Sequence, residues 1–499
     1  MNRLSRLTIN SLTVAVFFLL DKVLAFVRTG IISRRYADSV HMLDTFNAAN
    51  NLPDVLFALI SGGALAMAFI PLLTEYLTLK DRAAAWDLFS RVANVAFVIT
   101  AAFAIIISIF AAPIARLGIA PGFSEEQLSL LAELMRLNLV GTIIFSISGL
   151  VAASLQANQH FIFPALAPSM YNIGQILGAV FLVPRFGIHG LVYGVILGAA
   201  MHLLIQLPAL FKFGFRWTPS LNLRHTGLIE AMKLMAPRLL TMGGIQFIVL
   251  ARDNLASRLD QVGAVTSLTY GWMIMQVPET VLGTAIATAM LPTLSEYAAR
   301  ADWVGFRSTI ERALRVLISL TIPIGAVMAA GLHPLVRAVF GFDEATTTLL
   351  TWTARAYLLT LIGYTIHEVA ARSFYARKEP MFPLYAVMLR IVLFLGIGFI
   401  GLTFFREIGA PVIAFAEIAL LIEAIILFSW LSKRTHQPIR VGGAVWKGIG
   451  GALLGGATAY ALAVYVPGSA VMTTLLGMVV GGILALTLIW SEAKLLLKL

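Results

Sequence analysis

The sequence predicts an all-α polytopic membrane protein, and three observations lead to this fold class. Of the 499 residues, 59% are hydrophobic and only 12% are charged, and the mean hydropathy is +0.88. A soluble chain carries about 25% charged residues. The apolar residues form runs close to the ~20 residues that one membrane-spanning helix needs, and parts of the first half recur in the second. Together these features exclude a soluble enzyme.

Apolar runs bounded by charged residues, Gly or Pro define the expected helices in chain order. Each run is long enough to cross the hydrocarbon core once. The pattern predicts about fourteen transmembrane helices. The expected spans are 9–33, 45–76, 89–112, 130–156, 161–184, 188–211, 228–256, 264–297, 312–332, 349–375, 382–404, 410–431, 444–466 and 470–491.

Loop charge predicts the orientation of these spans. With an even number of helices, both termini face the same side of the membrane. The even-numbered loops and the two termini together carry sixteen Lys and Arg, against seven in the odd-numbered loops. Because positively charged loops stay in the cytoplasm, we expect both termini to be cytoplasmic.

An internal repeat predicts how the helices are grouped. Residues 62–76 read GGALAMAFIPLLTEY and residues 283–297 read GTAIATAMLPTLSEY. At this offset of 221 residues Pro71 aligns with Pro292, and both segments end in Glu-Tyr. Two apolar helices share Ala and Leu by chance, but a shared Pro and Glu-Tyr in register indicate a true repeat.

The direction of the repeat follows from its length. After a slip of two residues, an offset of 219 pairs Arg136 with Arg355. The offset spans six helices, an even number, so both copies enter the membrane in the same direction and the repeat is parallel. We therefore expect two six-helix lobes, 1–224 and 225–440, and a two-helix C-terminal extension, 441–499.

Composition and motifs exclude several kinds of chemistry. The chain has no cysteine, which excludes disulfides and thiolate metal sites. It contains no H-E-x-x-H, G-x-x-x-x-G-K-[ST] or G-x-S-x-G pattern, so we expect neither an enzyme nor a bound metal or cofactor. The net charge of +11 comes from cations in short loops between apolar runs, which favours membrane lipids over nucleic acid as the partner. Without an ATP-binding motif, active transport has to draw on the membrane potential or on an H⁺ or Na⁺ gradient.

Ionisable residues inside the apolar runs are the candidate functional residues. Each costs roughly 2.5–3.5 kcal/mol at the bilayer centre, so those that remain usually face a cavity or a partner. Lys22 and Arg28 on the first helix and Asp44 on the second belong to this group. Each has a structural alternative. Lys22 can pair with Asp21, and Arg28 can extend to the outer interface. Asp44 can cap the second helix.

Three further arginines extend the candidate set. Arg238 and Arg252 lie fourteen residues apart on the seventh helix and share one face. Arg372 lies on the tenth helix. Local ion pairs are the alternative for two of them, because Asp253 adjoins Arg252 and Glu368 precedes Arg372 by one helical turn.

Two other intramembrane groups favour structural roles. Arg390 on the eleventh helix can pair with Glu417 or Glu423 on the twelfth. His367 stands alone in its segment, so we expect a packed or hydrogen-bonded histidine there and not a metal ligand.

Several longer stretches carry a family resemblance. They are DKVLAFVRTGIISRRYADSVHMLDTFNAANNLPDVLF (21–57), PALAPSMYNIGQ (164–175), MQVPETVLGTAIATAMLPTLSEY (275–297) and SFYARKEP (373–380). Together they resemble the MurJ/MviN lipid II flippases of the multidrug/oligosaccharidyl-lipid/polysaccharide exporter superfamily, over nearly the whole chain. The resemblance implies two six-helix lobes around a central cavity, a two-helix extension that forms a lipid-facing groove, and a bacterial inner-membrane location. It also implies an undecaprenyl-pyrophosphate-linked peptidoglycan precursor as cargo.

The functional residues of the family carry over only in part. Its two first-helix cations fall on Lys22 and Arg28, with Lys in place of the usual Arg, and its second-helix acid falls on Asp44. Three family cations have no counterpart in this chain. Phe57, Ala58 and Met273 stand at their positions.

The leading hypothesis is a monomeric flippase that moves a lipid-linked peptidoglycan precursor from the inner to the outer leaflet by alternating access. A pyrophosphate needs Arg or Lys clusters, because guanidinium groups bind phosphate oxygens through paired, charge-assisted hydrogen bonds. The missing cations leave an exporter of another lipid-linked saccharide, or a drug/ion antiporter, as an alternative. A transport-inactive membrane scaffold for cell-wall synthesis is the alternative from a different class.

Overall fold

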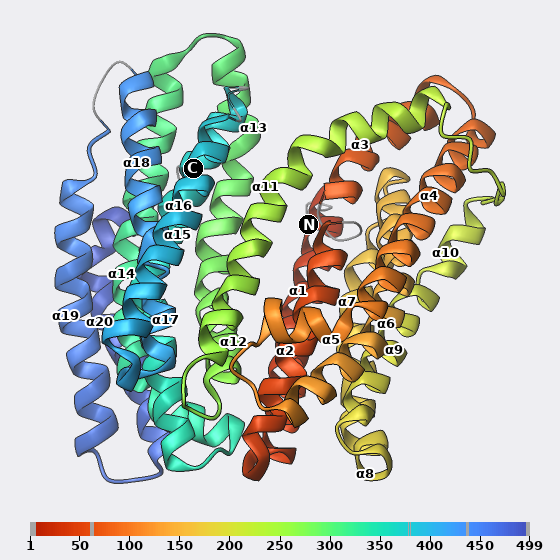
Figure 1. Ribbon diagram of the computed structural model, residues 1–499. Helices are drawn as coiled ribbons and strands as arrows, with labels where there is room; N and C mark the ends of the chain where they lie inside the picture. The colour runs from red at the N-terminus through yellow and green to blue at the C-terminus, as the bar shows by residue number, and fades with distance from the viewer. Residues whose placement is uncertain (1–5, 60–63, 378, 380, 436–438, 496–499) are drawn as a thin grey trace. The chain divides into compact units, whose positions relative to one another are not determined.

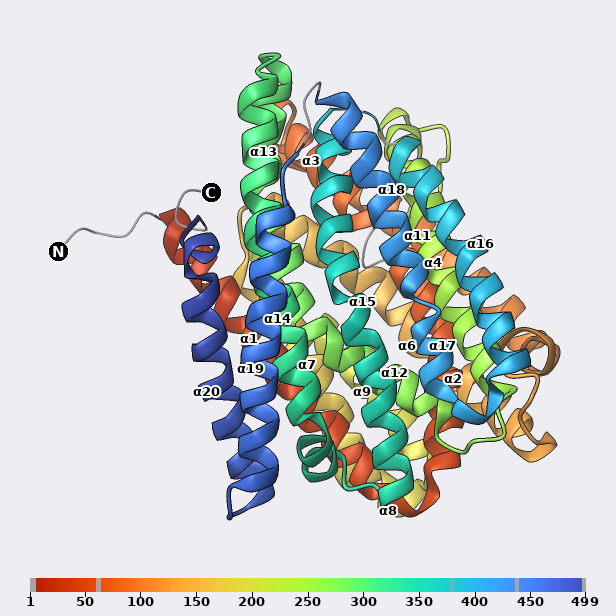
Figure 2. The same cartoon turned by 90° about the vertical axis from the view of Figure 1, so that its left-hand side faces the viewer.

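The computed structural model describes residues 6–59, 64–377, 379, 381–435 and 439–495. All regular secondary structure in these residues is helical (Figures 1 and 2). The chain divides into two compact units, Met1–Asn254 and Leu255–Leu499. The division into 1–224, 225–440 and 441–499 stays a prediction.

The N-terminal unit holds the helices labelled α1 to α10 and most of α11. Short π-helical or 3-10 segments interrupt or join several of them. The elements are α1 (Arg6–Arg35), η1 (Ala37–Ser39), α2 (Val40–Phe57), α3 (Ala64–Leu79), α4 (Arg82–Ile109), α5 (Ala111–Pro113), η3 (Ile114–Ile119), α6 (Glu125–Ala157), α7 (Ile162–Leu177), η4 (Gly178–Leu182), α8 (Val183–Phe186), α9 (His189–Leu204), α10 (Leu207–Lys212) and α11 (Thr226–Ser257).

The C-terminal unit holds the remaining helices, of which α19 and α20 pack against each other and against α14 (Figure 2). The elements are α12 (Ala264–Pro278), η5 (Glu279–Thr284), α13 (Ala285–Ala299), α14 (Trp303–Phe340), α15 (Glu344–Ala376), α16 (Met381–Phe404), η6 (Arg406–Ile408), α17 (Ala410–Phe415), α18 (Ile418–Arg434), α19 (Gly442–Tyr465) and α20 (Ala470–Ala493).

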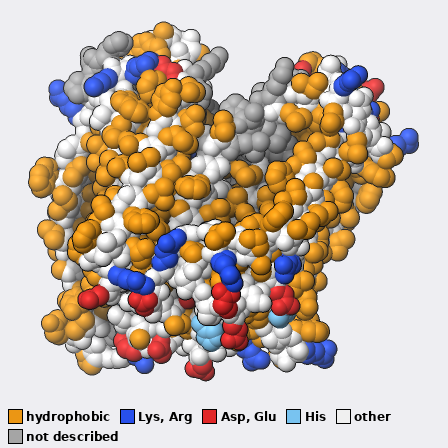
Figure 3. Space-filling view, in the orientation of Figure 1, with side chains coloured by type: hydrophobic (Ala, Val, Ile, Leu, Met, Phe, Trp, Pro, Cys, Tyr) orange, Lys and Arg blue, Asp and Glu red, His pale blue; other side chains and the backbone are white. Residues whose placement is uncertain are grey.

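Length and hydropathy make this a multi-pass membrane protein. Within each unit, the face drawn in Figure 3 shows hydrophobic side chains along the helices, with Lys, Arg, Asp and Glu gathered towards their ends. Nine helices of the described residues are long and apolar enough to cross a membrane. The prediction of an all-helical polytopic membrane protein is confirmed. The nine are Arg82–Ile109, Glu125–Ala157, Ile162–Phe186, His189–Lys212, Trp303–Phe340, Met381–Phe404, Ala410–Arg434, Gly442–Tyr465 and Ala470–Ala493.

Helix ends differ from the predicted spans where polar residues continue a helix. The span predicted at 312–332 is the middle of α14, which runs from Trp303 to Phe340. Asp302 caps this helix by accepting a hydrogen bond of 2.8 Å from the Gly305 amide, and the charged turns that follow lie outside the apolar run. Hydropathy detects only the part of a helix that is apolar, so the predicted ends were wrong here.

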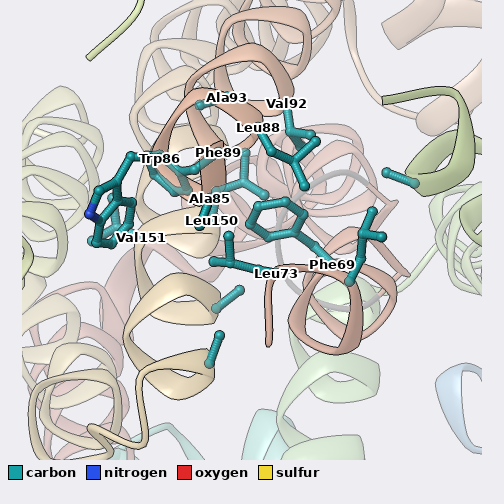
Figure 4. Packing of buried hydrophobic residues seen from close by; sticks show 14 of the residues in the cluster. Phe69, Leu73, Ala85, Trp86, Leu88, Phe89, Val92, Ala93, Leu150 and Val151 are labelled. Atoms are coloured by element: carbon teal, nitrogen blue, oxygen red, sulfur yellow. The ribbon is translucent and has the colours of Figure 1, made fainter. Parts of the chain in front are cut away.

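Packing in the N-terminal unit centres on aromatic and aliphatic side chains of α3, α4 and α6. Phe69 packs on Phe89 with ring centroids 6.2 Å apart, and the Phe89 ring meets the edge of Trp86 at 5.8 Å (Figure 4). Trp86 donates its indole N–H to the Phe213 carbonyl at 3.2 Å. This cluster holds the three helices together at one end of the unit.

Helices α7 and α9 approach each other through glycines. A Cβ built on Gly174 would lie 2.3 Å from the Gly198 Cα, and one built on Gly194 would lie 2.9 Å from the Gly178 Cα. Small residues four apart let two backbones meet in this way in membranes. The contact places α7 and α9 side by side. Both helices line the cavity described below.

Each unit contains a similar arginine contact, at positions that the predicted repeat aligns. In α6 the Arg136 Nε donates to the Ser108 carbonyl at 3.0 Å, and in α15 the Arg355 Nε donates to the Ala329 carbonyl at 2.9 Å. Ser108 and Ala329 are 221 residues apart. Each arginine therefore ties its helix to the helix before it in the same way.

Candidate functional site

A cavity of about 250 Å³ with both polar and apolar lining residues lies inside the N-terminal unit. Helices α2, α6, α7 and α9 enclose it, and two of them carry a proline on the cavity wall. Proline cannot donate the usual helical hydrogen bond. The Thr142 hydroxyl donates to the carbonyl of one of these prolines at 3.4 Å. The lining residues are Asn50, Pro53, Asp54, Phe57, Asn138, Gly141, Thr142, Phe145, Pro168, Tyr171, Val195 and His202.

Charged and amide groups are among the residues that line this cavity. The Asp54 side chain is exposed to it, and Arg28 of α1 lies within electrostatic range of both the Asp54 carboxylate and the Tyr171 hydroxyl. Asn138 donates to the Asn50 side-chain oxygen at 2.6 Å. A carboxylate, a phenol and two amides in one cavity, with an arginine within electrostatic range of the first two, can bind a polar group inside the membrane.

Aromatic rings also line the cavity. The Phe145 ring packs against Phe57 at 4.8 Å and against Tyr171 at 5.0 Å. The His202 ring lies 5.2 Å from Phe145, and its Nδ1 is hydrogen bonded to the Ser148 hydroxyl at 2.6 Å. The cavity thus offers apolar surface beside its polar groups.

Arg252 lies in the same unit, beside α2. Its Nε donates to the Asp253 carboxylate at 2.7 Å, and both side chains are buried. Asn51, the neighbour of a cavity residue, donates to the same carboxylate. The local ion pair considered from the sequence is therefore present, and it connects Arg252 to the helix that lines the cavity.

Arg372 lies in the C-terminal unit. It pairs with Glu368 one turn earlier on α15 and lies within electrostatic range of Glu279. Glu279 in turn accepts a hydrogen bond of 2.8 Å from Thr284. The local pair expected from the spacing is present here too.

The other predicted residues have different surroundings. The Lys22 side chain is exposed on α1, and both Lys22 and Arg28 lie within electrostatic range of Asp21. Asp21 accepts a hydrogen bond of 2.7 Å from Asn172 on α7. The side chain of Arg238 lies outside the described residues.

Asp44 does not cap the second helix, so that alternative was wrong. Helix α2 begins at Val40 after Ser39, which places Asp44 one turn inside it, where it is buried. A capping residue has to precede the first turn, because its side chain accepts from the free N–H groups there.

Sequence reasoning missed the acid of the cavity. Asp54 follows Pro53 near the end of α2, and this carboxylate inside the predicted span 45–76 was the available signal. Asn138, Tyr171 and His202 gave weaker signals, because uncharged polar residues are common in membrane helices.

Two further features limit the chemistry of the site. Phe57 stands where the resembling family has a cation, and its ring lines the cavity. In the part of the chain that the structure describes, no group of three or more His, Asp or Glu could hold a metal ion.

Comparisons with known proteins identify the family. The profile of the family described as "Lipid II flippase MurJ" matches residues 39–496. The lipid II flippase MurJ of Burkholderia cenocepacia is 30% identical over 447 residues, which cover 86% of this chain and 84% of that protein. The probable lipid II flippase MurJ of Vibrio cholerae is 26% identical, over 85% of this chain and 83% of that protein.

Solved structures show the same fold. The structure described as "Lipid II flippase MurJ, inward closed conformation" matches with a TM-score of 0.79 at 22% identity, over 95% of this chain and 98% of that one. An inward-facing multidrug resistance MATE family transporter of the MOP superfamily matches with a TM-score of 0.73 at 15% identity, over 83% of this chain and 94% of that one. A family profile that matches more than nine-tenths of the sequence identifies a transporter and not an enzyme, and the chain belongs to the MurJ family of lipid II flippases.

Proposed function

We propose that the chain moves an undecaprenyl-pyrophosphate-linked peptidoglycan precursor from the inner to the outer leaflet by alternating access. The observation that carries this proposal is the family match over residues 39–496. The cavity, whose residue Asp54 lies within electrostatic range of Arg28, supports it, since an intramembrane arginine without a function would be costly.

The architecture that we propose for this transporter has fourteen transmembrane segments. Two six-helix lobes, 1–224 and 225–440, are related by a parallel repeat, and the extension 441–499 adds two helices. The matching Arg136 and Arg355 contacts to carbonyls 221 residues apart support the repeat. In this proposal the protein acts as a monomer in the bacterial inner membrane with both termini in the cytoplasm.

The proposed binding chemistry places the pyrophosphate near Arg28. Guanidinium offers paired N–H donors to phosphate oxygens, and Lys22 adds a point charge on the same helix. In the absence of cargo, Asp54 is the counter-charge of Arg28. Phosphate oxygens then replace the carboxylate when the headgroup enters. Arg252, Arg238 and Arg372 are the proposed sources of further positive charge, with Asp44 as a second acid.

Complementation tests this function. A bacterium depleted of its own lipid II flippase should grow when it expresses this chain, and Arg28→Ala should abolish growth at matched membrane levels. Arg300→Ala is the control, because Arg300 is exposed and pairs only with its helical neighbour Glu296 among the contacts described. Failure of the wild-type chain despite normal membrane levels would contradict the proposal.

A second cargo, another lipid-linked saccharide, is favoured by one observation. Phe57, Ala58 and Met273 replace three cations of the family, and the Phe57 ring lines the cavity. If the cargo differs for this reason, the wild-type chain should fail in complementation and Phe57→Arg should restore growth. Growth of the wild type, unimproved by Phe57→Arg, supports lipid II as cargo.

A further inference from the structure

An open groove lies in the C-terminal unit where α15 begins, beside α17 (Figures 1 and 2). Its volume of about 430 Å³ is that of a small-ligand site, for which ~300–1,000 Å³ is usual. In the orientation that we propose, with both termini in the cytoplasm, this end of α15 faces the outer side of the membrane. We call this feature the α15 groove. Its walls include Gln261, Ala345, Thr348, Trp352, Ile408 and Pro411.

The α15 groove combines an aromatic ring with neutral polar groups. Its described lining residues carry no charge, and Trp352 is 55% exposed. Gln261 is held by donating to the Glu407 carbonyl at 3.3 Å, and its buried Oε1 accepts no hydrogen bond from the described residues. An indole ring stacks on the C–H face of a sugar, while amide and hydroxyl groups pair with the sugar hydroxyls. The lining of the groove therefore suits a neutral saccharide.

A cation without a counter-charge lies one turn deeper on the same helix. Arg355 is half-buried, and its guanidinium carbon lies 4.8 Å from the centroid of the Trp352 ring. Its Nε donates to the Ala329 carbonyl at 2.9 Å, and the neutral phenol of Tyr460 lies within electrostatic range. Among the described residues no carboxylate pairs with Arg355, and neither of its Nη groups donates a hydrogen bond. This pair of Nη groups is the edge that binds phosphate oxygens through parallel hydrogen bonds.

The depth of Arg355 makes an anionic ligand favourable. Arg355 lies about 16 Å along the axis from the first residue of α15, inside the span predicted for this helix. An unpaired cation is costly there, so a phosphate that neutralises it gains more than at the protein surface.

The first unit provides a comparison, because the predicted repeat aligns Arg136 with Arg355. Arg136 makes the same bond to a carbonyl but is exposed. Glu133 stands where Trp352 stands in the second unit, at the offset of 219. The carbonyl bond is therefore common to both copies, whereas the aromatic ring beside the guanidinium belongs to the second copy.

We propose that the α15 groove and Arg355 form an exit site, which holds the lipid-linked saccharide after it has reached the outer leaflet. The order of groups along α15 matches such a lipid. The saccharide fills the groove, its phosphate binds the Nη groups of Arg355, and the polyprenyl chain continues towards the bilayer centre. The inference rests on the proposed function and adds a second binding site for the same cargo.

Protection of a single thiol tests the exit site in the full-length protein. The chain has no cysteine, so Ala345→Cys places one thiol on the exposed wall of the groove. Lipid II is mixed into phosphatidylcholine nanodiscs before assembly, so that both leaflets contain it and no transport is needed. It should slow the reaction of this thiol with N-ethylmaleimide about tenfold when nine-tenths of the sites are filled. Val304→Cys is the control that should react at an unchanged rate, because Val304 is 79% exposed and does not line the groove.

Substitutions in the Ala345→Cys protein separate the phosphate half of the site from the saccharide half. Arg355→Gln should raise the lipid II concentration for half-protection about tenfold or more, because the charge-assisted hydrogen bonds are lost. Arg136→Gln is the matched control, since it removes the same carbonyl bond in the other unit and should leave protection unchanged. Trp352→Ala should also weaken protection by lipid II. Undecaprenyl pyrophosphate, which has no saccharide, should leave the thiol reactive.

Three results overturn the proposal. They are no protection by lipid II, protection that Arg355→Gln leaves unchanged, and equal protection by phosphatidylglycerol or undecaprenyl pyrophosphate at the same mole fraction. If Arg355→Gln does not fold, Trp352→Ala decides, because its side chain is exposed, and unchanged half-protection overturns the exit site. Protection in a chain that fails complementation contradicts the proposed function alone. Growth of a chain whose thiol lipid II does not protect removes the exit site alone.

Discussion

The two C-terminal helices depend on one buried carboxylate, and this dependence can be measured. Glu492 on α20 is 1% exposed and accepts hydrogen bonds from Arg315 of α14 at 2.8 and 3.1 Å and from Lys447 of α19 at 2.7 Å. Removing one partner of a fully buried ion pair costs about 3–5 kcal/mol. The two cations are 36% and 42% exposed, so water replaces part of what they lose. We therefore expect Glu492→Gln to lower the free energy of local opening of α20 by about 2–3 kcal/mol, or about 30- to 150-fold in the equilibrium.

Hydrogen–deuterium exchange of the α20 amides in detergent measures this opening. Glu492→Gln should accelerate exchange in α20 by that factor and leave α6 unchanged. Arg315→Gln should have a smaller effect, because Lys447 remains to neutralise the carboxylate. Glu407→Gln is the control, since Glu407 is exposed on the short 3-10 segment η6 of the same unit. Exchange of α20 within threefold of the wild-type rate in Glu492→Gln would refute the reasoning.

Three further substitutions test other features. Arg28→Lys should restore only part of the growth that Arg28→Ala abolishes in complementation, because lysine lacks the paired donors; full growth with either variant removes Arg28 from the site. Gly194→Leu should prevent stable folding, measured as monodisperse protein after extraction, because even a Cβ there would lie 2.9 Å from the Gly178 Cα. Asp343→Ala should cost about 1 kcal/mol by uncapping α15. Hydrogen bonds from the Thr346 hydroxyl and amide hold the pKa of Asp343 below its ordinary value, so this cost should be present at neutral pH and vanish as the pH falls through that lowered pKa; equal exchange at the start of α15 in both proteins at pH 7 would contradict the cap.

The sequence predicted several helices well because a bilayer imposes a simple requirement on composition. The span expected at 382–404 is α16, Met381–Phe404, and that at 470–491 is α20, Ala470–Ala493. Other spans were wrong: 45–76 covers both α2 and α3, and 264–297 covers α12, η5 and α13. The ends of α14 also differ, because a cap and charged turns extend this helix beyond the apolar run. Hydropathy cannot detect such turns, because they are stabilised by capping and not by the membrane.

Of the residues at the candidate site, the sequence singled out Arg28 but not Asp54. Arg28 is conspicuous because a cation is rare in an apolar run. Its neighbours depend on how helices pack, and no local pattern encodes that Asp54 of α2 and Tyr171 of α7 share one cavity. The Arg390–Glu417 pair was expected because the sequence places one arginine and two acids on adjacent segments. The sequence could not show which acid lies closer to Arg390. In the structure, Glu423 Oε2 lies 3.9 Å from Arg390 Nε, and Glu423 Oε1 lies 3.1 Å from His367 Nδ1.

In the repeat that we propose, two residues of the cavity and two residues of a buried ionic group hold corresponding positions. At the offset of 219, Phe145 corresponds to Tyr364 and Tyr171 to Arg390. The first two residues line the cavity in one unit, whereas Arg390 donates a hydrogen bond to Tyr364 in the other. A substitution at Phe145 or Tyr171 therefore changes the shape of a cavity, whereas the equivalent substitution at Tyr364 or Arg390 leaves a buried polar group without its partner. Equivalent substitutions in the two units should for this reason differ in their cost to stability.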